Sequence, residues 1–174
     1  DVCIATYRRG EMLANTLVSL DRMTIPHDVE VRIVIVDNDA ARSAHMVVET
    51  FKETSRHPVE YVNEPRKGIS FARNAALAIR RGDYLAFLDD DEIADAAWLE
   101  QMHKCAVDYA ADVVFGPVLS ILPENVPEWI RRGAFFERPR DVTGTSRPCG
   151  ATRSVMFRTK VLDAAGRAFD DRAG

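Results

Sequence analysis

The sequence predicts an α/β fold in which helices cover both faces of a mostly parallel, doubly wound central sheet. Two observations support this prediction: strand-like apolar runs alternate with helix-like segments along most of the chain, and polar loops follow several of those runs. The 174 residues suit one domain with a buried core. In a parallel sheet such loops share the carboxyl edge of the strands, where ligands bind.

Four strand-like runs and three helix-like segments alternate in the first half of the chain. The run at residues 31–36 is nearly all β-branched, which is typical of a strand buried on both faces. Gly82 marks the end of the third helix. The expected strands are residues 2–5, 31–36, 59–62 and 84–88. The expected helices are residues 12–20, 41–54 and 69–81.

The alternation of strand-like and helix-like segments becomes less regular in the second half of the chain. Residues 122–148 are rich in Pro, Arg and aromatic side chains, which predicts a loop or a short helix at 129–136. Trp129, Phe135 and Phe136 belong either to an acceptor-side or membrane-surface helix or to the core, and we slightly favour the core. The other expected elements are a helix at 96–110, strands at 113–120 and 154–158, and a helix at 159–165.

Composition narrows the class of protein. A hydrophobic fraction of 47% and a net charge of -4 without any long block of like charge are typical of a soluble globular protein that binds no nucleic acid. The three cysteines are far apart and are expected to be free thiols. No apolar run approaches the roughly 20 residues that span a bilayer, so we expect a cytoplasmic protein. Because the chain runs from Asp1 to Gly174 without a closing element, we expect a fragment truncated on its C-terminal side.

The strongest single feature is the run Asp89-Asp90-Asp91-Glu92, which directly follows an apolar strand. Four adjacent carboxylates repel one another unless a positive charge neutralises them. Mg²⁺ and Mn²⁺ prefer such oxygen ligands and leave coordination sites for substrate phosphates. The run therefore predicts a metal and diphosphate site. The alternative is a solvated acidic turn that caps a helix beginning near Ala94.

Polar residues also follow the first two expected strands. Asp37 and Asp39 can accept hydrogen bonds from a nucleotide base or ribose, although an Asx turn or a helix cap by Asp39 is nearly as good an explanation. Thr6, Tyr7 and Arg8 offer a hydroxyl, an aromatic face and a cation for a nucleoside and its phosphate. Taken alone, these three residues are a weak indication.

A third loop opens the helix that begins after Gly68. Arg73 lies on the first turns of this helix, where it can reach an acidic strand end or a diphosphate. The alternative is an amphipathic helix on which Arg73 makes a surface ion pair. The chain has no P-loop, dinucleotide fingerprint or nucleophile elbow, so nothing supports an ATPase, a dehydrogenase or a serine hydrolase.

In this order the motifs resemble glycosyltransferase family 2, a group of GT-A fold enzymes that includes bacterial exopolysaccharide and capsule glycosyltransferases. The likeness covers nearly the whole chain, and four motifs that each follow a strand are strongly specific together. The matching segments are Cys3-Ile4-Ala5-Thr6-Tyr7-Arg8, Ile35-Val36-Asp37-Asn38-Asp39, the Gly-x-x-x-Ala-Arg-Asn segment from Gly68 to Asn74, and Leu88-Asp89-Asp90-Asp91-Glu92, which resembles the family's Asp-x-Asp motif.

The resemblance implies roles for particular residues. It implies a Mn²⁺ or Mg²⁺ ion held by Asp89 and Asp91. The implied donor-binding residues are Ala5, Thr6, Tyr7, Arg8, Asp37, Asp39, Gly68, Arg73, Asp89 and Asp90. The implied acceptor-side residues are Gly150, Thr152 and Arg158. The catalytic base of the family is a carboxylate shortly after such an acceptor-side segment, and since Asp170 and Asp171 come too early, we expect the base beyond Gly174.

The predicted function is an inverting, metal-dependent glycosyltransferase. It would move a sugar from a nucleotide-diphosphate donor, expected to be a UDP-sugar, to a glycan or lipid-linked acceptor in cell-surface polysaccharide synthesis. A lipid-linked acceptor would place the protein at the inner face of the cell membrane as a peripheral protein. The alternatives are a non-catalytic nucleotide- or glycan-binding domain, or a sugar-phosphate nucleotidyltransferase, for which Tyr7-Arg8-Arg9-Gly10 is a poor phosphate loop.

Overall fold

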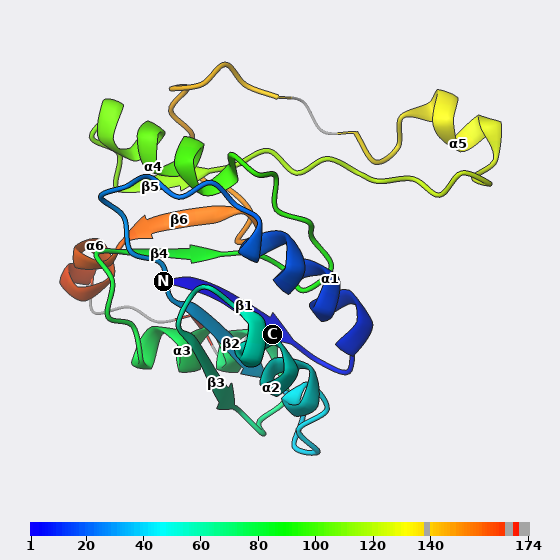
Figure 1. Ribbon diagram of the computed structural model, residues 1–174. Helices are drawn as coiled ribbons and strands as arrows, with labels where there is room; N and C mark the ends of the chain where they lie inside the picture. Colours follow the sequence, from blue (N-terminus) through cyan, green and yellow to red (C-terminus); the bar gives the residue numbers. More distant parts are fainter. Residues whose placement is uncertain (138–139, 166–168, 171–174) are drawn as a thin grey trace.

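The computed structural model describes residues 1–137, 140–165 and 169–170. Its centre is a six-stranded sheet with the strand order β3-β2-β1-β4-β6-β5 (Figure 1). The strands are β1 (Val2–Thr6), β2 (Ile33–Asp37), β3 (Val59–Asn63), β4 (Tyr84–Phe87), β5 (Val113–Phe115) and β6 (Val155–Arg158). Strands β1 to β4 pair in parallel, whereas β6 pairs antiparallel with both β4 and β5. The mostly parallel α/β sheet is therefore confirmed.

The helices follow the predicted order with shifted ends. They are α1 (Gly10–Asp21), α2 (His45–Thr54), α3 (Ile69–Ala78), α4 (Trp98–Asp108), α5 (Glu128–Gly133) and α6 (Thr159–Ala165). Helix α2 begins at His45 rather than at residue 41, because the Asp37 carboxylate holds the preceding turn by accepting the Ala44 N–H at 2.8 Å. Strand β5 ends at Phe115, directly before Gly116-Pro117, because proline cannot donate a ladder hydrogen bond.

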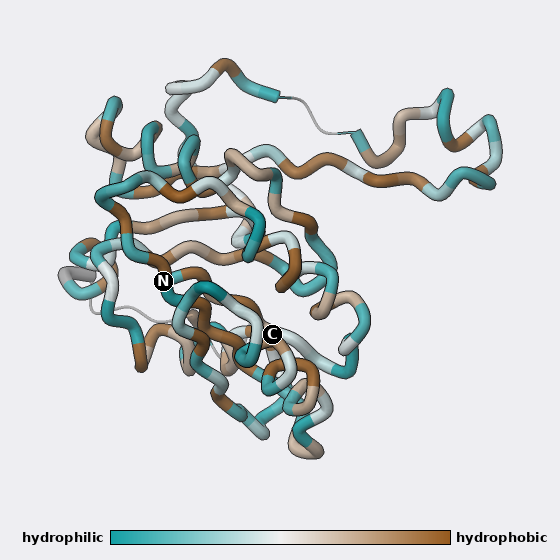
Figure 2. Tube along the Cα trace, viewed as in Figure 1, coloured by the Kyte–Doolittle hydropathy of each residue, from teal (hydrophilic) through white to brown (hydrophobic). Residues whose placement is uncertain are grey.

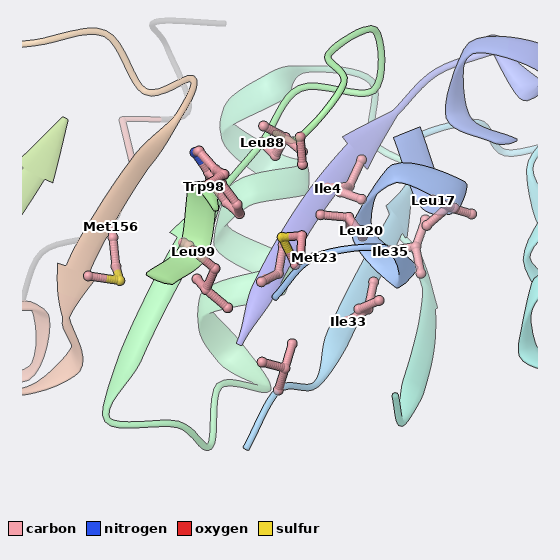
Figure 3. Close-up of a cluster of buried hydrophobic side chains, with 14 of the residues drawn as sticks. Ile4, Leu17, Leu20, Met23, Ile33, Ile35, Leu88, Trp98, Leu99 and Met156 are labelled. Atoms are coloured by element: carbon pink, nitrogen blue, oxygen red, sulfur yellow. The ribbon is translucent and has the colours of Figure 1, made fainter. Parts of the chain in front are cut away.

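Alternating residues of the strands face two separate hydrophobic layers. On one face Ile4, Ile33 and Ile35 pack with helices α1, α2 and α4, and Figure 3 shows this cluster. On the other face Cys3 and Val34 pack against α3, with α6 at the margin. Both β1 and β2 are therefore covered on both faces, as their apolar runs predict. The carboxyl ends of β1, β2, β3 and β4 are left as the open edge.

The aromatic residues near α5 are exposed, and the preference for a core position is wrong. The chain leaves the body of the molecule after β5 and returns before β6 as a long excursion (Figure 1). Hydrophobic stretches run along this excursion (Figure 2). Trp129 is 66% exposed, Phe135 64% and Phe136 56%, because no layer of the sheet lies beneath them. Among the described residues, no helix is long and apolar enough to cross a membrane.

The three cysteines are all free and differ in burial, which yields a test of the fold. Burial raises the pKa of the Cys3 thiol to about 12, whereas Cys149 is exposed and Cys105 is partly buried. A thiol reagent at pH 8 should therefore modify Cys149 first and Cys3 only on unfolding, because the thiolate is the reactive form. Mass spectrometry of the labelled peptides checks the order. Early labelling of Cys3 in the native protein would contradict the packing of β1.

Candidate donor and cation site

The acidic turn after β4 is held in place by two threonines. Thr6, the last residue of β1, donates from Oγ1 to Asp90 Oδ2 at 2.7 Å, and both groups are buried. Thr16 on α1 donates to the backbone oxygens of Asp90 at 3.0 Å and Glu92 at 2.8 Å. The turn therefore lies against β1 and α1, and the predicted gathering of the loops after β1 and β4 is confirmed. No helix begins near Ala94, since α4 starts at Trp98, so the capping explanation is wrong.

The carboxylates of the turn differ in exposure and in partners. Asp90 is 5% exposed, and its two oxygens accept from Thr6 and from Arg9. Asp89 and Asp91 are the open ones, with side chains 39% and 48% exposed. Arg9 Nη1 lies 3.0 Å from Asp91 Oδ2 and 3.2 Å from Asp90 Oδ1. Two open carboxylates therefore face the solvent, and Arg9 is bonded to one of them, Asp91.

The acidic turn lacks enough positive charge to balance its partly buried carboxylates. Burial raises the pKa of Asp89, although Arg73 at 3.6 Å opposes this effect. Burial likewise raises the pKa of Glu92, and Arg153 acts against both shifts. Glu92 Oε2 accepts the Asp89 N–H at 3.2 Å, while Glu92 Oε1 is buried and has no hydrogen-bond partner among the described residues. An additional cation would reduce the repulsion among the carboxylates and would give the unpaired Glu92 oxygen a partner.

The residues present fit a small divalent cation. Within the described ranges, no three acidic, histidine or cysteine side chains converge into a ready-made metal cage. Mg²⁺ and Mn²⁺ sites do not require one, because these ions are held by one or two carboxylates together with substrate phosphates. Asp89 and Asp91 supply hard oxygen ligands at the open side of the turn. The arrangement therefore suits a cation that arrives with a phosphorylated ligand.

A second group of side chains lies around Tyr7 at the ends of β1 and β2. Arg8 Nε donates to Asp39 Oδ2 at 2.9 Å, and this bond lowers the pKa of Asp39. Asp39 Oδ1 also accepts the Ala41 N–H at 3.2 Å, so the Asx turn is present. The Arg8 and Lys67 cations each lie 5.1 Å from the centre of the Tyr7 ring. An aromatic ring with two nearby cations and a carboxylate acceptor suits a nucleoside with its phosphates.

Asp37 differs from the other predicted contacts because it has no exposed surface. Its oxygens accept from the Asp39 N–H at 3.1 Å, the Ala44 N–H at 2.8 Å and the Tyr61 hydroxyl at 2.9 Å. A direct contact between Asp37 and a ligand would require Tyr61 or the turn before α2 to move. In this conformation Asp37 positions the loop that carries Asp39.

Asn38 joins this loop to the start of α3, although no role was predicted for this residue. Its amide nitrogen donates to the backbone oxygens of Glu64 at 2.9 Å and Arg66 at 2.7 Å. Its amide oxygen accepts the Gly68 N–H at 2.8 Å. Gly68 has a φ of 146°, which is a region that L side chains rarely adopt. The predicted role of Gly68 is therefore conformational here, since it turns the chain into α3.

Arg73 is half-buried rather than on the surface, so the surface ion pair is wrong. Its guanidinium lies 5.8 Å from the Phe87 ring centre and 5.6 Å from that of Phe169. The adjacent Asn74 binds the backbone of Phe169 through two hydrogen bonds, of 2.9 and 2.8 Å. Helix α3 therefore holds the backbone of Phe169 in place. Asp171 and Gly174 lie outside the described residues.

The three predicted acceptor-side residues do not lie together. Gly150 and Thr152 line a largely apolar cavity of about 240 Å³ with Phe115, Phe157 and Phe169. Arg158 lies at the opposite end of the sheet, paired in register with Tyr84 at the start of β4. Its guanidinium packs 5.0 Å from the centre of the Tyr84 ring. The prediction for Arg158 is therefore wrong, because β6 is antiparallel and its start, not its end, lies at the acidic edge.

Three cations at this edge were not predicted as site residues. Arg9 directly follows the predicted Tyr7 and Arg8, and Lys67 directly precedes Gly68, so their positions in these loops could have drawn attention to them. Arg153 carries no such signal, because only the antiparallel pairing of β6 brings the start of that strand to the acidic turn.

Known proteins resemble the chain over nearly its whole length. The profile of glycosyl transferase family 2 matches residues 1–166. Succinoglycan biosynthesis protein ExoM of Rhizobium meliloti (strain 1021) is 38% identical over 170 residues, which are 97% of this chain and 54% of ExoM. Glycosyltransferase GlyA of Streptococcus pneumoniae is 27% identical over 115 residues, 66% of this chain and 16% of GlyA. The chain thus spans about half the length of ExoM and less of GlyA.

Solved structures share the fold. S. aureus TarS 1-349 superposes with a TM-score of 0.75 at 20% identity, over 98% of this chain and 50% of that one. Mannosyltransferase PcManGT from Pyrobaculum calidifontis, solved with GDP-Man and Mn²⁺, gives a TM-score of 0.72 at 19% identity, over 95% of this chain and 46% of that one. The predicted GT-A fold is confirmed. With the profile match over residues 1–166, the chain belongs to glycosyltransferase family 2.

Proposed function

We propose that the protein is an inverting glycosyltransferase that moves a sugar from a nucleotide-diphosphate donor to a glycan or lipid-linked acceptor in cell-surface polysaccharide synthesis. The observation that carries this proposal is the convergence of the Tyr7 and Asp39 group with the acidic turn at one edge of a family 2 sheet. The relative ExoM is named for succinoglycan biosynthesis. Family membership favours sugar transfer over the nucleotidyltransferase alternative.

The donor is proposed to lie across the carboxyl edge of the sheet. The nucleoside would contact Asp39 and the Tyr7 ring between Arg8 and Lys67, while Thr6 and Asp90 keep the two loops together. Ala5 would support this loop from within β1, as Gly68 does from the start of α3. UDP is the proposed nucleotide, supported by a TarS structure with UDP-GlcNAc. GDP remains the competing choice, because PcManGT was solved with GDP-Man.

The proposed cation is Mn²⁺ or Mg²⁺, held by Asp89 and Asp91. When bound, it would supply positive charge that stabilises the departing nucleotide diphosphate. Arg73, which packs beside the Phe87 and Phe169 rings and lies 3.6 Å from Asp89, would fix the orientation of that carboxylate. A carboxylate base would remove the proton of the acceptor hydroxyl in a single displacement. We assign none of the described residues as that base.

The acceptor is proposed to approach past Gly150 and Thr152, on the side where Phe169 is fastened to α3. The exposed aromatic side chains around α5 support a peripheral contact with the inner face of the cell membrane, where a lipid-linked acceptor would be found. Sugar transfer by the full-length protein distinguishes this proposal from a domain that only binds nucleotides or glycans.

A nucleotide screen tests the donor site. UDP, GDP, CMP and ADP are added to the protein with and without Mn²⁺, and unfolding is followed by thermal shift. One nucleoside diphosphate should stabilise the protein only with Mn²⁺, by about 2.7 kcal/mol at a hundred times its Kd. Asp91→Ala should lose this stabilisation, and the control Asp28→Ala, which removes an exposed carboxylate elsewhere, should keep it. Equal stabilisation of both variants would contradict the assignment of Asp91.

A second experiment separates two roles of Asp37. If Asp37 positions the loop, Asp37→Ala should lower the free energy of unfolding by about 3 kcal/mol or more, because buried donors lose their partner. Tyr61→Phe should cost only about 1 kcal/mol and leave nucleotide affinity nearly unchanged. Denaturant unfolding and calorimetric titration with the stabilising nucleotide measure both quantities. Normal stability of Asp37→Ala together with lost nucleotide binding would instead show a direct contact.

A further inference from the structure

Arg9 places a positive charge beside two carboxylates of the acidic turn before any ligand binds. It is the residue directly before α1, and its Nη1 bridges Asp90 Oδ1 at 3.2 Å and Asp91 Oδ2 at 3.0 Å. Its side chain is 52% exposed, so water surrounds much of it. Exposed ion pairs of this kind are weak and are readily exchanged.

The two carboxylates that Arg9 bridges are not equivalent. Asp90 is buried and also accepts from Thr6 at 2.7 Å, so it remains hydrogen-bonded without Arg9. Asp91 is half-exposed, and in the described part of the chain Arg9 is the only cation bonded to it. A divalent cation at Asp91 would therefore meet the Arg9 guanidinium at the same carboxylate. Two positive groups held on one carboxylate repel each other.

If the divalent cation displaced Arg9 from Asp91, the Arg9 guanidinium would lie beside the phosphates of the ligand. A cation held by Asp89 and Asp91 completes its coordination with phosphate oxygens. A guanidinium that starts 3.0 Å from Asp91 is then within reach of the same phosphates. Arginine can bind phosphate through two N–H groups at once. A single carboxylate oxygen does not make full use of both donors.

We propose that Arg9 is the resident counter-cation of the acidic turn, that it releases Asp91 to the incoming divalent cation, and that it then binds the diphosphate of the donor. This inference rests on the proposed metal-dependent donor site. Arg9 acts in opposite directions on two ligands: it competes with the bare cation and assists the nucleoside diphosphate. A residue that only maintained the shape of the turn would assist both.

The test uses Arg9→Gln and a matched control. Arg22→Gln removes the same charge from the far end of α1, about 18 Å away along a helix of 12 residues. Binding of MnCl₂ alone is measured by the paramagnetic resonance of free Mn²⁺. Binding of UDP or GDP, whichever stabilises the wild-type protein, is measured by calorimetry at saturating Mn²⁺.

Arg9→Gln should bind bare Mn²⁺ roughly two- to fivefold more tightly and bind the nucleoside diphosphate roughly tenfold or more weakly. Arg22→Gln should match the wild type in both. Unchanged or weaker Mn²⁺ binding by Arg9→Gln overturns the inference while leaving the donor site intact. Absence of Mn²⁺ binding by the wild-type protein overturns the proposed metal site itself, and the inference with it.

Discussion

Repulsion among the carboxylates of the acidic turn is the constraint on which the rest of the site depends. Asp89, Asp90, Asp91 and Glu92 follow one another at the end of a buried strand, so four like charges lie close together. The surrounding structure gives each a different environment. Asp90 is buried and hydrogen-bonded, Asp91 binds Arg9, and Asp89 pairs with the half-buried Arg73. One oxygen of Glu92 has no hydrogen-bond partner in the described part of the chain. The nearby arginines offset only part of the negative charge of the turn, which favours ligands that bring a cation.

The parallel sheet explains why these groups meet. Strands β1, β2 and β4 lie side by side and end at one edge, so Thr6, Asp39 and Asp90 come from loops far apart in sequence. The 2.7 Å hydrogen bond between Thr6 and Asp90 spans 84 residues. Such a contact needs both strands in register, and their register is set by apolar residues buried on both faces. Core packing and site geometry are therefore coupled through strand pairing.

The sequence predicted the features that depend on local pattern. The strands, the helices and the acidic turn were all visible, because apolar periodicity and adjacent charge are local properties. Arg158 was misplaced because the antiparallel direction of β6 arises from tertiary pairing with β4. Trp129 was misjudged because burial depends on which layer lies beneath a helix. The burial of Asp37 was likewise unpredictable, since its partner Tyr61 comes from a neighbouring strand.

Helix α3 connects the two sides of the proposed reaction. One turn of this helix carries Arg73, which faces Asp89, and Asn74, which holds the backbone of Phe169. Phe169 also packs edge-on against Phe87 at 5.7 Å, directly behind the strand end that bears the acidic turn. Any displacement of Asp89 would therefore disturb the cation–π contacts between Arg73 and both rings. Because Phe169 lines the apolar cavity together with Gly150 and Thr152, helix α3 links the proposed cation site to the proposed acceptor side.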